Sequence, residues 1–215
     1  IALSLVGSEM CIRDSMKTLI IGEIINNNLS SGTLEILGKA KSLDLDVQVV
    51  TVGSDENPSI GVDLCKQTYL KRQNNSLNLS KAATKISEII KNEEINLILG
   101  SSTYMCRDLI SFLSVDLNSS PVSNVIDFDV ASGNVSTVNS INGGESLYKT
   151  KINSNQALLL IRPKAFDPVE VNFNDDFETI DLDGSDLEVF DIFIEEKSGP
   201  QLEDCLLYTS PSPRD

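Results

Sequence analysis

The sequence predicts an α/β protein of three layers, in which a mostly parallel sheet lies between two layers of helices. Apolar runs suited to buried strands alternate with amphipathic helical patterns from Lys17 to Val130, which is the element order of such folds. Within Ile95–Asp129, an apolar run, a turn rich in Ser and Thr, a helix and a second strand form a crossover, so these two strands should be parallel. After Val130, short alternating strands between turns rich in Gly and Asn predict antiparallel additions to the sheet.

The first strand is expected over Lys17–Ile25, whose near-continuous apolar run suits a strand buried on both faces. A turn of three asparagines follows, and Ser30 or Ser31 caps a helix that runs to about Leu43. The residues of this helix that should face the sheet are Leu34, Leu37 and Ala40. The next strand is Asp46–Val52, which ends at a glycine.

The middle of the chain continues this alternation. Ile60–Gln67 is predicted as a short helix and Thr68–Gln73 as a third strand. Lys81–Asn92 is predicted as an amphipathic helix whose apolar stripe is Ala82, Ile86 and Ile89. Ile95–Leu99 is a buried strand, and the helix after it has the apolar stripe Leu109, Ile110, Leu113 and Leu117. Val122–Val130 is the strand that closes the crossover.

Three further strands are predicted as the antiparallel addition: Val135–Ile141, Ser146–Ile152 and Ala157–Ile161. Leu158 and Leu160 alternate with Leu159 and Ile161, so the last strand is apolar on both faces. One layer of helices does not cover that much apolar surface, and the surplus predicts an interface with a partner. The alternative is that the acidic stretch that follows folds back and covers it.

Composition excludes several classes of function. The net charge of −15 is concentrated in residues 167–204, which hold fourteen acidic residues and one lysine, so the rest of the chain is almost neutral. No basic stripe is available to bind nucleic acid, and no apolar run is long enough to insert into a membrane. The chain has no histidine, which removes the commonest general base and metal ligand. Its four cysteines form no C-x-x-C pair, so neither a metal site nor a disulfide framework is predicted, and a reducing cytoplasm is expected.

The turn Gly100, Ser101, Ser102 and Thr103 lies where open α/β sheets bind ligands, between the carboxyl end of a strand and the amino end of a helix. Its backbone N–H groups are candidates to hold a phosphate or a carboxylate of a partner. The alternative is that Ser102 or Thr103 caps the helix while Asp108 complements the helix dipole. Cys106 is either a thiol with a lowered pKa or a small residue packed against the turn.

Several stretches together resemble the amino-terminal domain of the electron-transfer flavoprotein alpha subunit. The run GSSTYMCRDLISFL followed by PVSNVIDF resembles that family's Gly-x-Ser/Thr turn, its Gly-Arg/Lys-Asp-Leu segment and the strand after it. Arg107, Asp108 and Leu109 match, whereas Cys106 replaces a usual Gly and Asn124 a usual Asp. The pieces GGESLYKTK and LLLIRPKAFDP resemble two later strands of the family, with Arg162 and Phe166 matching.

The resemblance covers residues 17–204 and implies a Rossmann-like fold of the nucleotide-alpha-hydrolase-like type. It implies a subunit that forms a heterodimer with a beta subunit and carries electrons from acyl-CoA dehydrogenases and related donors to a quinone oxidoreductase or another acceptor. The FAD would be bound by a carboxyl-terminal domain whose motifs are absent from this sequence, so no catalytic residue, no metal and no cofactor are expected in this chain alone. Arg107, Asp108 and Arg162 are the candidate interface residues, although Arg162 alternatively pairs with a nearby carboxylate.

The expected organisation has four parts. Residues 1–15 and 205–215 resemble translated adapter sequence and are expected to pack against nothing. Residues 16–166 form the α/β domain, and residues 167–204 form an acidic linker, with one or two edge strands, toward the missing FAD domain.

Two other functions are less consistent with the sequence. A stand-alone nucleotide-binding domain of the stress-protein type would hold phosphate on the Gly100–Thr103 turn, but the turn has no lysine and the chain no second glycine-rich loop. A hydrolase using Ser101 or Ser102 lacks both a histidine and a G-x-S-x-G elbow.

Overall fold

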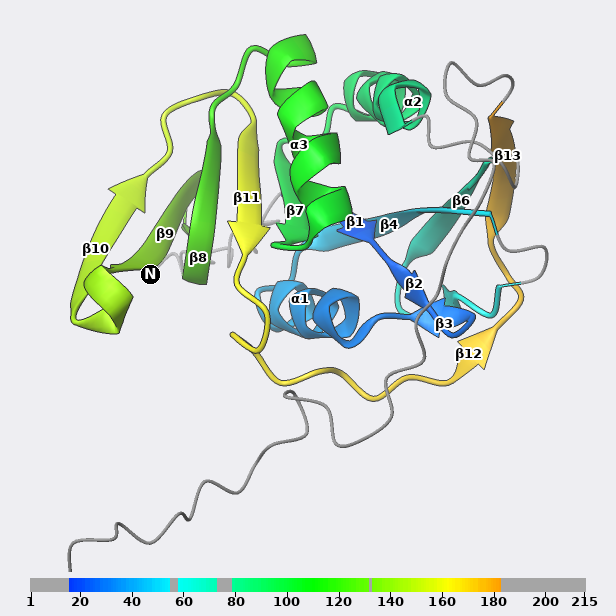
Figure 1. Ribbon diagram of the computed structural model, residues 1–215, viewed down its shortest axis with the longest axis horizontal. Helices are drawn as coiled ribbons and strands as arrows, with labels where there is room; N and C mark the ends of the chain where they lie inside the picture. Colours follow the sequence, from blue (N-terminus) through cyan, green and yellow to red (C-terminus); the bar gives the residue numbers. More distant parts are fainter. Residues whose placement is uncertain (1–15, 55–57, 73–78, 132, 183–215) are drawn as a thin grey trace, which may run out of the picture.

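The computed structural model describes residues 16–54, 58–72, 79–131 and 133–182. Within these residues, nine strands form one sheet in the order β10-β9-β8-β11-β7-β1-β4-β6-β13 (Figure 1). The strands are β1 (Lys17–Gly22), β4 (Asp46–Gly53), β6 (Lys66–Arg72), β7 (Leu97–Ser101), β8 (Pro121–Ala131), β9 (Asn134–Ile141), β10 (Ser146–Lys151), β11 (Ala157–Ile161) and β13 (Glu178–Leu182). All neighbouring strands from β8 to β13 pair in parallel, whereas β9 is antiparallel to both β8 and β10.

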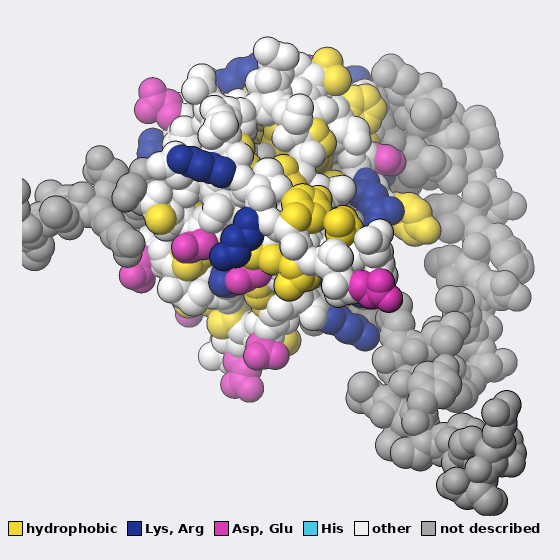
Figure 2. All heavy atoms as spheres, turned by 90° about the vertical axis from the view of Figure 1, so that its left-hand side faces the viewer, with side chains coloured by type: hydrophobic (Ala, Val, Ile, Leu, Met, Phe, Trp, Pro, Cys, Tyr) yellow, Lys and Arg dark blue, Asp and Glu magenta, His cyan; other side chains and the backbone are white. Residues whose placement is uncertain are grey.

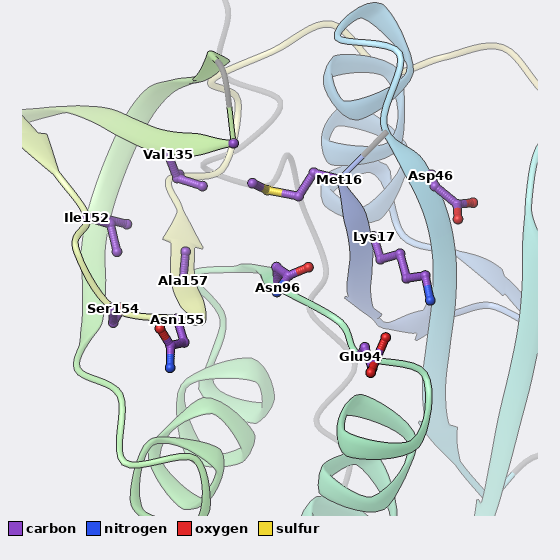
Figure 3. Close-up of a pocket in the computed structure, with 11 residues that line it drawn as sticks. Met16, Lys17, Asp46, Glu94, Asn96, Val135, Ile152, Ser154, Asn155 and Ala157 are labelled. Atoms are coloured by element: carbon purple, nitrogen blue, oxygen red, sulfur yellow. The ribbon is translucent and has the colours of Figure 1, made fainter. Parts of the chain in front are cut away.

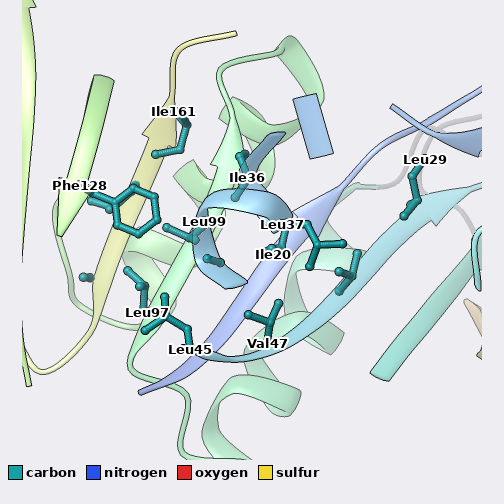
Figure 4. Close-up of a cluster of buried hydrophobic side chains, with 14 of the residues drawn as sticks. Ile20, Leu29, Ile36, Leu37, Leu45, Val47, Leu97, Leu99, Phe128 and Ile161 are labelled. Carbon is teal, nitrogen blue, oxygen red and sulfur yellow. The ribbon is translucent and has the colours of Figure 1, made fainter. Parts of the chain in front are cut away.

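Helices cover both faces of the sheet and make the three layers. Helix α1 (Ser31–Ser42) lies on one face, and α2 (Leu79–Asn92) and α3 (Tyr104–Asp116) lie side by side on the other (Figure 1). The strand side chains alternate between the two cores. Ile20 packs in the cluster beside α1 that Figure 4 shows, while Leu19 and Ile21 pack beneath α2 and α3. This double burial explains the continuous apolar runs of the central strands, and the predicted mostly parallel α/β fold is confirmed.

Local signals in the first crossover act as the sequence predicts. Asn26 and Asn27 adopt left-handed backbone conformations, with φ of 52° and 66°, between the short strands β2 (Ile24–Ile25) and β3 (Asn28–Leu29). Ser30 is the N-cap of α1 and accepts a hydrogen bond from the backbone N–H of Thr33. The predicted single strand over Lys17–Ile25 is therefore divided at Glu23, which lies between β1 and β2.

The helix predicted over Ile60–Gln67 is wrong. The segment forms the short strand β5 (Gly61–Val62), a turn, and the beginning of β6. Strand β5 pairs with β12 (Phe173–Asn174), and a Cβ on Gly61 would lie only 1.9 Å from the Oδ1 atom of Asn174. Pairing with a strand more than a hundred residues away decides this conformation, and local sequence patterns do not contain that information.

The predicted role of Ala157–Ile161 is also corrected. Strand β11 is parallel to both neighbours and lies inside the sheet, between β7 and β8. All of its residues are buried: Leu158 and Leu160 face the core beneath α2 and α3, and Leu159 and Ile161 face the core beside α1. The apolar residues on its two faces therefore leave no surplus surface for a partner. The exposed apolar side chains at this end of the sheet are instead Ile141, Leu147 and Tyr148, at the end of β9 and on β10.

The acidic stretch begins as part of the domain. After β11 the chain runs along α1, where the backbone N–H of Val169 donates to the carbonyl of Leu34 over 3.3 Å (Figure 1). Apolar side chains from this segment pack on the core beside α1: Phe166, Val169, Val171, Phe173 and Phe177. Strand β13 then extends the sheet at its edge, so the ordered packing continues through Leu182. The expectations for residues 1–15, 183–204 and 205–215 lie outside the described residues. No helix in the described parts of the chain is long and apolar enough to cross a membrane.

Candidate functional site at the carboxyl edge of the sheet

The sheet changes direction of winding between β1 and β7. From β1 the chain passes through α1 to β4 on one side, and α2 later returns it to β7 on the other side of β1. The carboxyl ends of these two strands carry Glu23 and the turn Ser101–Thr103. In open α/β sheets, this switch point is the usual position of a bound ligand.

Here side chains from the two strand ends hydrogen-bond to each other across the switch point. Thr103 is the N-cap of α3, and its hydroxyl both accepts from the backbone N–H of Cys106 over 3.4 Å and donates to the carboxylate of Glu23. The backbone N–H of Glu23 donates in turn to the hydroxyl of Thr33 over 3.1 Å. Ser101 is buried against the start of α1, where a Cβ on Gly32 would lie 2.8 Å from the Ser101 hydroxyl. A negative charge thus already occupies the place that a phosphate would take.

The prediction that the turn caps the helix is confirmed for Thr103. The predicted dipole role of Asp108 is wrong, because α3 begins at Tyr104 and its first turn contains no acidic residue. Asp108 lies one turn later and is exposed.

Cys106 is a packed residue. Its side chain is fully buried, and its thiol donates to the backbone carbonyl of Ile21 over 3.5 Å. Burial, together with the negative charge of Glu23, raises the pKa of the Cys106 thiol to about 12. The thiol is therefore protonated at neutral pH, and the packing interpretation holds rather than a thiol with a lowered pKa.

On the other side of the α3 amino terminus, three of the predicted residues meet in an open groove of about 750 Å³. We call it the arginine groove, and its lining is Ser102, Arg107, Asn124, Ser140, Ile141, Asn142, Gly143, Arg162 and Pro163. The Nε and Nη2 atoms of Arg107 donate to the Ser102 hydroxyl over 3.2 and 3.1 Å. The backbone N–H of Ser102 donates to the carbonyl of Ile161 over 2.7 Å, and that of Arg162 donates to Val125 over 2.8 Å.

Arg162 has no acidic partner among the residues that the structure describes. Within the described residues its guanidinium forms no ion pair, and no carboxylate lines the groove, so the predicted pairing of Arg162 with a nearby carboxylate is not found. Of the other predicted site residues, Gly100 and Ser101 lie buried beneath the turn, Thr103 faces Glu23, and Asp108 does not line the groove.

Sequence reasoning did not single out Glu23 or Asn142 as site residues, and it identified Asn124 only as a departure from the family pattern. Asn124 has a φ of 55°, and its amide donates to the carbonyl of Ser140 over 2.8 Å at the point where the pairing of β8 with β11 shifts register. Asn142 begins the left-handed turn of η1 (Asn142–Gly144), which forms one wall of the groove. The Asn-Gly-Gly run is a visible turn signal, whereas nothing local indicates that Glu23 accepts a hydrogen bond from the N-cap residue of a helix eighty residues away.

Two further hollows differ from the arginine groove in the residues that line them. The hollow at the amino edge, of about 800 Å³, is lined by acidic, basic and neutral residues, and Met16 points across it toward Val135 (Figure 3). The hollow beside the switch point, of about 340 Å³, contains Glu23 and Arg72. At the switch point, the Glu23 carboxylate accepts from the Thr103 hydroxyl. The arginine groove has no aromatic side chain in its lining to stack on a flavin ring.

Among the described residues, no cluster of three acidic, Cys or His side chains is suited to a metal ion.

Comparison with known proteins agrees with the fold. A sequence model described as "Electron transfer flavoprotein domain" matches residues 18–183. The Escherichia coli K12 protein named "Putative electron transfer flavoprotein subunit YdiR" is 24% identical over 135 residues, which are 62% of this chain and 43% of that protein. The match spans less than half of the relative's length. Because the domain match covers most of the sequence, the chain belongs to the electron transfer flavoprotein domain family, whose members are flavin-dependent electron carriers.

Proposed function

We propose that this chain is the amino-terminal portion of the alpha subunit of a heterodimeric electron-transfer flavoprotein. In this role the complete protein carries electrons from acyl-CoA dehydrogenases and related donors to a quinone reductase or another acceptor, in the cytoplasm. The family match over residues 18–183 supports the general assignment. The Arg107-Asp108-Leu109 segment and the Arg162 to Phe166 segment, which resemble the alpha subunit, support the finer one.

The observation that carries the proposal is the closed switch point. Glu23 accepts a hydrogen bond from Thr103 where a nucleotide-binding relative of this fold would hold phosphate, so the domain retains the architecture without a suitable phosphate site. We therefore infer that FAD is bound by a carboxyl-terminal domain that follows this one, linked to it by the part of the acidic stretch beyond β13. The redox chemistry would belong to the flavin, and this domain would serve as a structural platform that contacts the beta subunit.

The experiment is expression of the complete gene, continued past Asp204, together with the gene for a candidate beta subunit. We expect a heterodimer that retains one FAD through gel filtration and is reduced by an acyl-CoA dehydrogenase with its substrate. The 215-residue chain purified alone should show no flavin absorbance. Stoichiometric FAD on the short chain would contradict the assignment of FAD to another domain.

The stand-alone nucleotide-binding alternative makes a different prediction. ATP or AMP would bind the short chain tightly, and Glu23→Gln would strengthen binding because it removes a negative charge from the phosphate position. The carboxylate at this position argues against that function. Calorimetric titration of the short chain and of Glu23→Gln with both nucleotides distinguishes the two functions, and tight binding by the unaltered chain would favour the alternative.

A further inference from the structure

The arginine groove is a concentration of positive charge in an acidic protein. Of the three arginines in the described residues, Arg107 and Arg162 line this one groove, while the whole chain has a net charge of −15. The rest of the lining is uncharged. Two guanidinium groups without a carboxylate between them repel each other, so their placement in one groove indicates an anionic ligand.

In the described residues, neither arginine forms an ion pair. The two hydrogen bonds from Arg107 to the Ser102 hydroxyl fix one edge of its guanidinium, and no described residue accepts from its Nη1 atom. The backbone of Arg162 is fixed by its hydrogen bond to Val125, and its side chain is exposed. The groove therefore presents guanidinium donors that no described carboxylate occupies, and such donors suit the paired oxygens of a carboxylate.

The surroundings of the groove favour a protein as the ligand. Tyr104, one turn before Arg107 on α3, is 88% exposed, and Ile141 in the groove is 45% exposed. On β10, Leu147 and Tyr148 are exposed as well, on alternate faces of the strand. In the view onto this end of the molecule, hydrophobic side chains gather near the middle of the face, with charged side chains around them (Figure 2). Exposed Arg and Tyr side chains beside apolar ones are typical of protein interfaces, whereas a small ligand is normally enclosed much more fully.

We propose that the arginine groove binds the carboxylate side chains of an acidic segment from a protein partner. Arg107 and Arg162 would each donate to a carboxylate, while Tyr104 and Ile141 would pack beside the segment. The inference rests on the proposed function in one respect only, namely that the acidic segment would belong to the partner subunit. The chemistry of the groove does not depend on the flavin.

The test uses a hexaglutamate peptide as the probe and the full 215-residue chain labelled with ¹⁵N. We expect saturable shifts of the Arg107 and Arg162 side-chain Nε–H signals and of backbone amides in the groove, and none with a hexaserine peptide. Arg107→Gln and Arg162→Gln should each weaken binding about tenfold, because each removes a charge-assisted hydrogen bond. Lys149→Gln, which removes an equal charge from an exposed position of β10, should change the affinity less than about twofold.

A second variant separates charge from geometry. Arg162→Lys keeps the charge but loses the planar fork, so its affinity should lie between those of the unaltered chain and Arg162→Gln. Equal weakening by Lys149→Gln and by the arginine variants would mean a non-specific charge effect and would overturn the proposal. So would the absence of saturable shifts, or saturation by inorganic phosphate without binding of the peptide. The well-dispersed backbone spectrum of each variant serves as the control for folding. Because no flavin takes part, failure here leaves the assignment to an electron-transfer flavoprotein untouched.

Discussion

The two sides of the α3 amino terminus differ in how they treat charge. Toward β1, the Glu23 carboxylate accepts from the Thr103 hydroxyl, and the backbone N–H of Glu23 donates to Thr33. Toward β11, Arg107 and Arg162 stand in an open groove with no carboxylate in its lining. The two sides are separated only by the turn Ser101–Thr103.

The difference in charge indicates that the two sides of the α3 amino terminus have different roles. The side that binds ligands in related architectures is closed by an internal hydrogen bond, so it contributes to stability. The arginine groove has no acidic residue in its lining to neutralise Arg107 and Arg162. Its arginines are therefore free to contribute to the binding of a partner. If this is correct, substitutions on the closed side should lower the free energy of unfolding, and those on the open side should leave it unchanged.

The largest effect is expected from the strand that supports both sides. Leu159 on β11 is fully buried, so Leu159→Ala should lower the free energy of unfolding by about 3 kcal/mol through lost burial and a residual cavity. Leu147→Ala on the exposed β10 is the matched control and should cost no more than about 0.5 kcal/mol. Urea unfolding followed by circular dichroism measures both. Equal effects would mean that β11 is not the buried internal strand that the sheet order shows.

On the closed side, Thr103→Ala should lower the free energy of unfolding by about 1 kcal/mol, because it removes the helix cap. It also leaves the Glu23 carboxylate without its hydrogen-bond donor. Ser102→Ala is the control from the same turn, since its hydroxyl accepts only from the exposed Arg107, and it should have a smaller effect. A larger loss for Ser102→Ala would reverse the comparison between the two sides.

The sequence predicted the parts of this arrangement that depend on local patterns. The capping residues Ser30 and Thr103 were among the predicted caps, and the runs around Ile20 and Leu99 were recognised as strands because alternate residues face two apolar cores. The parts decided by distant neighbours were not predictable in this way. Gly61 is extended because Asn174 pairs with it, and Leu158 is buried because β11 enters the sheet between two strands that precede it in the chain.

The candidate site divides in the same manner. Resemblance pointed to Arg107 and Arg162, but only the fold shows that the two lie in one groove with Ser102. Glu23 follows β1 and acts on α3, so its contribution depends on β1 and β7 being neighbours in the sheet. The sequence pattern of either strand alone does not show that β1 and β7 are neighbours.

Alkaline pH gives a further test of the closed side. The Cys106 thiol has a pKa of about 12 in the folded protein and an ordinary value of 9.0, so its contribution to stability is complete below pH 9. As the pH rises above 9, the unfolded chain loses this proton while the folded chain keeps it, which favours unfolding until the folded pKa is reached. Between pH 9 and 10 the unaltered chain should lose about 1 kcal/mol more than Cys106→Ala, measured by urea unfolding at each pH. Parallel pH profiles would show that the thiol is not as buried as the packing indicates.

The smallest effect is expected on the open side. Arg107→Gln and Arg162→Gln should each change the free energy of unfolding by less than about 0.5 kcal/mol, because both side chains are exposed and neither forms an ion pair with a described residue. Arg107 loses only its hydrogen bonds to Ser102, which water replaces at an exposed site. Urea unfolding at neutral pH measures the change, and a loss above about 1 kcal/mol for either variant would assign that arginine to the structure of the domain. A neutral result for stability, together with the tenfold loss of hexaglutamate binding expected above, would separate recognition from folding at two positions that line the same groove as Ser102.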